Sequence, residues 1–369
     1  MTATSPSAAD TAGKPSIISP WVDTLAIGGL SLLVLVPLLL SGRADFSLVS
    51  LGSQATIAAL INMPHFLASY RMVYRSKEMI LRHKWASIYI PLLLLAYVVV
   101  AIYLSQYTPA MVSLLLAVSS IYLAWHYTGQ AWGMMATYAH LDGVPFSQGE
   151  RNLIRGGLRI LLAWHVIWFL HSSELLGMFG FDVGPLYTVI SALTLVALGL
   201  GAFGLSRFRA RTGRLPPVKA MVAWAAIFVW YAAMARDPRA LFWVQIAHAL
   251  QYLIFPVRVE LNVTERTDPV RSHVARHMAL YGAILLLASW FMSNQLPTHA
   301  MAIVANALGD RPGQMTPMMI LAFLNIHHYF TDQVIWKIRN PEVQRDLFAH
   351  VQVAGGPSNR RAGGKTKGR

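Results

Sequence analysis

Residues 86–104, ASIYIPLLLLAYVVVAIYL, form an apolar run without a charged side chain. In an α-helix, which rises 1.5 Å per residue, this run is about as long as the roughly 30 Å of hydrocarbon in a bilayer. It therefore predicts a transmembrane helix, and similar runs recur along the chain. We expect ten spans, at 22–41, 51–70, 86–104, 110–138, 155–172, 185–205, 218–235, 240–257, 277–294 and 316–337.

The composition supports the same fold class. Of the 369 residues, 55% are hydrophobic and only 12% are charged, and the mean hydropathy is +0.47. These values are typical of a multi-pass membrane protein. We predict an all-α, polytopic helical bundle with a flexible tail at 1–20, a single transmembrane domain at 21–338 and a basic, largely disordered tail at 339–369. The shorter apolar piece at 298–308 is expected to lie in the interface or to re-enter the membrane.

The chain has a net charge of +14, and most of its Lys and Arg residues lie between the expected spans or in the tails. If both termini are cytoplasmic, only Arg43, Arg236, Arg239 and Arg311 of the 30 Lys and Arg residues lie outside cytoplasmic segments. This bias follows the positive-inside rule and predicts both termini on the cytoplasmic side, in the inner or plasma membrane if the cell is bacterial. The positive charge is thereby explained by the membrane, so no nucleic-acid partner is expected.

The chain has no cysteine. This excludes disulfides, thiolate metal sites and a cysteine nucleophile.

Four of the apolar runs contain histidines that are flanked by other polar residues. They are His65 in the second span, His126 in the fourth, His248 in the eighth and the pair His327–His328 in the tenth. These four spans all run inward, so the imidazoles are expected at similar depth. Polar groups in hydrocarbon are costly and usually face the bundle interior or a functional site.

Further polar residues flank these histidines at helical spacing. Asp332 is the one acid well inside an apolar span, and a buried carboxylate needs a nearby cation to stay charged. Tyr252, one turn beyond His248, is a candidate proton donor. The residues expected to orient ligands or a bound molecule are Gln130, Gln245, Gln251 and Asn325.

Imidazole and carboxylate ligands together suit iron, manganese, copper or zinc. We expect His65, His126, His248 and His328 to bind a metal. His327 and Asp332 would serve as a further ligand and its partner, or exchange roles with His328. Without thiolate ligands, a redox role favours non-haem iron.

The pair His327–His328 with its nearby carboxylate resembles the histidine-box membrane oxygenases and desaturases. The scattered single histidines resemble the membrane carotenoid-cleaving dioxygenases, which gather them from separate helices. Leu324 and Asn325 stand where a desaturase box has another histidine, and His65 stands alone where a first box has two. The resemblance therefore implies a mononuclear site and an oxidoreductase that takes a lipid, isoprenoid or other apolar substrate from the bilayer, with a soluble electron donor on the cytoplasmic side.

Three other interpretations stay open. Two facing histidines could hold a b-type haem. The His, Gln and Asp stripes could form a proton or cation pathway in a transporter or channel. The polar residues could also be contacts between helices in a membrane scaffold.

Overall fold

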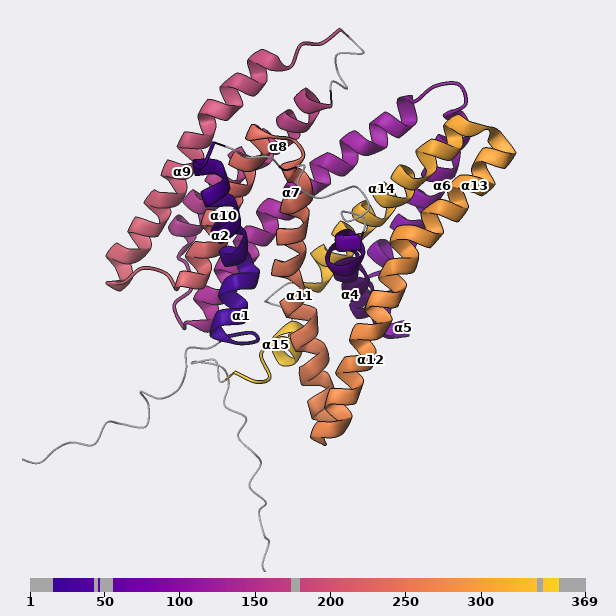
Figure 1. Cartoon of the computed structure of the whole chain (residues 1–369). Coiled ribbons are helices and arrows are strands. Elements are labelled where there is room, and N and C mark those ends of the chain that lie inside the picture. The colour runs from indigo at the N-terminus through magenta and orange to yellow at the C-terminus, as the bar shows by residue number, and fades with distance from the viewer. Residues whose placement is uncertain (1–15, 43–45, 47–55, 174–179, 337–340, 352–369) are drawn as a thin grey trace, which may run out of the picture.

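The computed structural model describes residues 16–42, 46, 56–173, 180–336 and 341–351, and every regular element in these ranges is helical (Figure 1). π-type turns at Leu25–Gly29, Ala58–Asn62, Trp85–Tyr89 and Phe291–Gln295 precede or join the helices. In chain order the helices are α1 (Pro20–Thr24), α2 (Leu30–Leu40), α4 (Met63–Val73), α5 (Lys77–Arg82), α6 (Ile90–Leu104), α7 (Ala110–Leu141), α8 (Gln148–Ser172), α9 (Gly184–Thr212), α10 (Val218–Arg236), α11 (Ala240–Thr267), α12 (Arg271–Trp290), α13 (Leu296–Leu308), α14 (Asp310–Ile335) and α15 (Pro341–Leu347).

Eight helical segments in the described ranges are long and apolar enough to cross a membrane. They are compatible with the expected multi-pass membrane protein. The second and tenth expected spans correspond to α4 and α14, which are outside this set, and the start of the second, 51–55, lies outside the described residues. Polar side chains such as His327, His328 and Asp332 lower the hydropathy of α14.

Residues 298–308 are part of a longer helical segment and not a separate apolar piece. The π-type turn at Phe291–Gln295 joins α12 to α13, so 271–308 is one helical segment. The wider turn carries the helix through the polar stretch Ser293-Asn294-Gln295 and leads into Pro297, which has no N–H to donate to the preceding turn.

Figure 1 shows α8, α9 and α10 with α1 and α2 on one side, and α6, α12, α13 and α14 on the other. α7 packs on α8, α10 and α14, whereas α11 packs on α4, α10 and α12. These two helices therefore connect the two sides of the bundle. Because α4 packs on α11 and α14, α14 packs on α7, and hydrogen bonds link α11 to both α7 and α14, polar residues on the inner faces of these four helices are brought together.

Small residues allow the closest helix contact. A Cβ atom added to Gly157 of α8 would lie 2.5 Å from the carbonyl oxygen of Ala197 in α9, and one added to Gly204 would lie 2.7 Å from the side chain of Ile154. Glycine at both positions therefore lets α8 and α9 approach, as small residues do in membrane-protein bundles.

Helix α15 closes one end of the bundle. The carboxylate of Asp346 accepts hydrogen bonds from Arg266 at 3.1 Å and from Arg75 at 3.4 Å, and the Asn262 amide donates to the carbonyl oxygens of Asp346 and Leu347. Residues 341–347 of the expected C-terminal tail are thus helical and attached to α11. Most of both expected tails, 1–15 and 352–369, lies outside the described residues.

Candidate metal centre

Each of four helices contributes one buried imidazole to the middle of the bundle. His65 follows Pro64 near the start of α4, His126 lies midway along α7, His248 on α11, and His328 on the last turns of α14. Their exposed fractions lie between 0 and 9%. Since each stands on a helix packed against the others, their positions are set by the bundle itself.

The four imidazole rings contact one another in the middle of the bundle. The ring centroids of His65 and His328 lie 4.7 Å apart, those of His126 and His248 4.7 Å, those of His126 and His328 5.1 Å, and those of His65 and His248 5.4 Å. All four pairs pack edge to face. We call these residues the histidine cluster.

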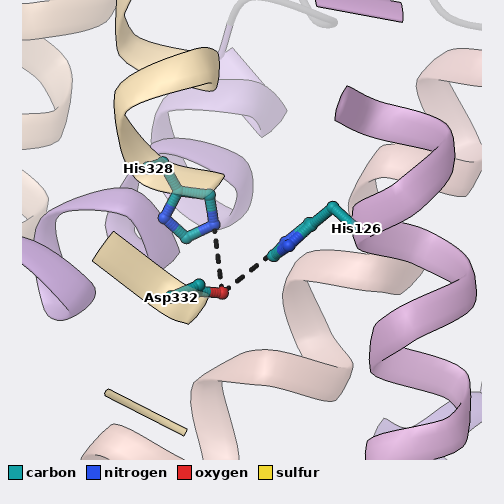
Figure 2. A group of neighbouring side chains, drawn as sticks. All are labelled: His126, His328 and Asp332. Atoms are coloured by element: carbon teal, nitrogen blue, oxygen red, sulfur yellow. Dashed lines mark ion pairs between the residues drawn. The ribbon is translucent and has the colours of Figure 1, made fainter. Parts of the chain in front are cut away.

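Asp332 completes the cluster on one side (Figure 2). Its Oδ2 atom lies 3.6 Å from Nε2 of His126 and 3.6 Å from Nε2 of His328. This is longer than a hydrogen bond between nitrogen and oxygen. The ligand atoms of the three residues all lie within 4.8 Å of one another, so they form a group that could hold a metal ion.

Ser69 contacts Nδ1 of His328 and so bears on which nitrogen of that ring carries the proton. The Ser69 hydroxyl donates to the carbonyl oxygen of Phe66 at 2.7 Å, and its oxygen lies 2.8 Å from Nδ1 of His328. Both contacts are hydrogen bonds at once only when the serine proton goes to the carbonyl oxygen, which only accepts, and the serine oxygen accepts from Nδ1–H. In a neutral imidazole the other nitrogen, Nε2, then presents its lone pair to Asp332.

Ring nitrogens in the cluster lack partners. Each of the four histidines has at least one buried nitrogen without a hydrogen bond to any described residue. Buried polar atoms are normally paired, because leaving one unpaired costs about 1–3 kcal/mol. The unpaired nitrogens of His126 and His328, together with Asp332, fit the donor set of a metal site, whereas the ring nitrogens of His65 and His248 lie outside this group.

The distances between the ligand atoms and the charge of Asp332 also suit a metal ion. Donor atoms that share one ion at about 2.0–2.2 Å lie roughly 3 to 4 Å apart, and the 3.6 Å separations fall in this range. In the described part of the chain, no Lys or Arg pairs with the carboxylate of Asp332. A buried carboxylate needs a cation, and an ion held by the imidazoles would provide it.

Tyr252 orients the carboxylate. Its hydroxyl donates to Oδ1 of Asp332 at 2.8 Å and accepts from the indole nitrogen of Trp336 at 2.8 Å. The second oxygen of Asp332 is therefore directed at His126 and His328. Tyr252 also lies beside the rings, with its centroid 5.5 Å from that of His65.

The Gln and Asn residues predicted to orient ligands lie around the histidine cluster. Gln130 donates to the carbonyl oxygen of His248 at 3.1 Å and to Oε1 of Gln251 at 3.0 Å, which links α7 to α11. Gln245 is half-buried one turn before His248. Asn325 accepts a hydrogen bond from Tyr329, whose ring centroid lies 4.7 Å from that of His126.

His327 is directed away from the cluster. Its Nε2 atom lies 3.0 Å from the carbonyl oxygen of Ala86 and 3.2 Å from the hydroxyl of Tyr74, and its ring stacks on Tyr70. The structure therefore brings together His65, His126, His248, His328, Asp332 and Tyr252. His327 is not in this group and instead contacts the segment before α6.

The roles of Ser69 and Trp336 are not predicted by the sequence. Ser69 follows His65 by four residues on the same polar face of α4, so the spacing predicts that it lies near the cluster. Its hydrogen bond to His328 is not predictable in this way, because the two residues are 259 positions apart. Trp336 stands just beyond the end of α14 and gave no polar signal.

Comparisons with known proteins identify no relative. No family model, no curated protein and no solved structure matches this chain.

Proposed function

We propose that this protein is an integral-membrane, metal-dependent oxidoreductase that acts on a lipid or another apolar substrate. The observation that carries the proposal is the convergence of four buried imidazoles and one carboxylate, with ring nitrogens that have no partner in the described residues. Such a group is expensive to bury unless it binds something, and its donor set suits a transition-metal ion.

The membrane setting is part of the proposal. The eight apolar helices and the placement of Lys and Arg support a multi-pass protein with both termini cytoplasmic, in the inner or plasma membrane if the cell is bacterial.

Each residue of the site has a proposed role. His126, His328 and Asp332 would hold the ion, with His65 and His248 as further ligands on the opposite side of the cluster. Tyr252 would hold the carboxylate in place and donate a proton. Gln130 and Gln251 would fix α7 against α11 so that His126 and His248 keep their positions.

Iron is the proposed metal because imidazole and carboxylate ligands without thiolate suit iron in oxygen chemistry. The metal would supply redox activation of O₂. In a hydroxylation, one oxygen atom of O₂ enters a C–H bond of the substrate and the other leaves as water, while a soluble reductant supplies two electrons and two protons.

A bare ion is favoured over haem by the packing of the cluster. The four rings contact one another edge to face at centroid distances of 4.7 to 5.4 Å. A porphyrin between any two of them would displace the other rings. The cluster also uses one histidine from each of four helices, which supports a mononuclear site over a desaturase-like pair of boxes.

Metal analysis of the purified protein tests the proposal. We expect close to one transition-metal ion per chain, with strong loss in His126→Ala and His248→Ala. His165→Ala is the matched control, since His165 is equally buried but bonds to Tyr231 outside the cluster. Less than about 0.2 metal per chain in the unmodified protein, with no change in the cluster variants, would end the proposal.

A further inference from the structure

A cavity of about 210 Å³ lies against the Asp332 side of the histidine cluster. His126, Tyr252 and Asp332 line its inner part, and Val343 and Leu347 of α15 also contribute to its wall. The cavity thus lies between α7, α11, α14 and α15 and borders two of the three residues of the metal-binding group.

Two glycines of α7 leave room for this cavity. Gly129 and Gly133 follow His126 by three and seven residues, so they share its face of the helix. A Cβ atom added at either position meets no atom within 4 Å. Neither glycine is therefore required by close helix packing, and the space in front of them is free for a ligand.

The cavity reaches the outer surface of the bundle between α7 and α14. Trp125 is 56% exposed, and Gly129 of α7 and Gln333 of α14 are exposed beside the cavity. One turn earlier on α7, Tyr122 closes the same seam by packing on Phe330, with ring centroids 5.2 Å apart. The opening lies midway along α7, a helix long and apolar enough to cross a membrane, so in the proposed membrane setting it would face lipid.

The lining disfavours anions in protein without a bound metal. No Lys or Arg is among the described residues that line the cavity, and the carboxylate of Asp332, when no metal neutralises it, would repel an anion. Trp125, Met134, Phe255 and Trp336 supply apolar wall. An apolar cavity of about 150 Å³ is enough to bind benzene, so this one holds the end of a somewhat longer group.

We propose that this cavity binds the end of a neutral, apolar chain, such as a long-chain alcohol, aldehyde or isoprenoid, which enters laterally between α7 and α14. Gly129 and Gly133 set the width of the passage. The identification of this molecule as the substrate rests on the proposed oxidoreductase function, whereas its binding depends on the cavity alone.

Photolabelling of the full-length protein in lipid nanodiscs tests the proposal. The probe is a long-chain alkanol that carries a diazirine near its hydroxyl end, and labelled residues are mapped by mass spectrometry. We expect labels on the lining of α7 and α14. Leucine at Gly133 or Gly129 would fill the passage and lower this labelling about tenfold or more, equivalent to about 1.4 kcal/mol in binding.

Gly199→Leu is the matched control, because Gly199 is an exposed glycine of α9 whose added Cβ also meets nothing within 4 Å. It should leave the labelling unchanged. In protein without bound metal, the corresponding diazirine alkanoate should label the lining much less than the alkanol. Equal labelling of the lining in the Gly133→Leu and Gly199→Leu proteins would overturn the proposal, and equal labelling by alkanoate and alkanol would overturn the neutral class.

Metal content measured on the same samples separates the two proposals. Labelling that is sensitive to Gly133→Leu in protein without metal would refute the oxidoreductase and support the ligand cavity. Bound metal with labelling that Gly133→Leu does not change would support the metal centre and refute the cavity proposal.

Discussion

The Nε2 atom of His328 and the Oδ2 atom of Asp332, one helical turn apart on α14, face each other at 3.6 Å. With its proton held at Nδ1 by Ser69, the neutral ring of His328 presents a lone pair to the oxygen. Two lone pairs that face each other in a buried setting repel unless a proton or a metal ion lies between them. This pair is therefore the contact that the proposed ion would relieve most directly.

Asp332→Asn tests the charge requirement. The substitution keeps the shape of the side chain but removes the anion, so we expect metal affinity to fall at least about tenfold, as measured by competition with a chelator. Asp310→Asn, an acidic residue at the exposed start of α14, is the control and should bind metal normally. If the site holds no metal, Asp332→Asn should instead raise thermal stability, because it removes an uncompensated buried charge.

Ser69→Ala tests the tautomer of His328. Loss of the acceptor at Nδ1 should leave Nε2 free to take the proton, and metal affinity should fall about 10- to 100-fold. Ser120→Ala removes another buried hydroxyl, from α7, that has no hydrogen-bond partner in the described residues. Metal affinity equal in the two variants would show that Ser69 does not position the ring.

Substitutions of the two adjacent histidines of α14 should have different effects on metal binding. His328→Ala should abolish metal binding, whereas His327→Ala should keep it and lower the free energy of unfolding by about 1–3 kcal/mol, because the Ala86 carbonyl and the Tyr74 hydroxyl lose a partner. Metal content and thermal unfolding of both proteins check this. Equal metal loss in the two would place His327 in the site and contradict the geometry.

Acid should release α15. Burial opposes ionisation of Asp346, but hydrogen bonds from Arg345 and Arg266 outweigh it and hold the pKa of Asp346 below its ordinary value of 3.8. A lowered pKa means that the carboxylate stabilises the folded protein above that value and that this contribution is lost as pH falls below it.

Hydrogen exchange of residues 341–351 at pH 7 and below about pH 4 measures this release. Exchange should accelerate at acid pH after correction for intrinsic rates. In Asp346→Asn we expect fast exchange at both values, and slow exchange at pH 7 in that variant would contradict the role of the carboxylate.

Much of the fold class is readable from the sequence. Long apolar runs need internally bonded backbone in lipid, and so they predict helices. The joined helix at 271–308 is not readable in this way, because the decision between a break and a π-type turn near Pro297 depends on local backbone geometry. The contact of α15 with α11 likewise depends on Arg and Asp residues far apart in the chain.

For the site, the sequence indicates which helices carry imidazoles but leaves their rotation open. His327 and His328 are about 100° apart on α14, and only the packing of Tyr70 and Ala86 against the first directs the second inward. The bond from Tyr252 to Asp332 requires a defined depth of α11 against α14, which no local pattern encodes.

The histidine cluster also constrains biogenesis. Its members are spread from the start of α4 to the last turns of α14, so a partly synthesised chain holds only some of the rings. The proposed ion would reach its full set of ligands only after α14 has been synthesised and has packed on α4 and α7. Loading would therefore be a late event in maturation, and a polypeptide that stops before His328 would lack one of the proposed ligands.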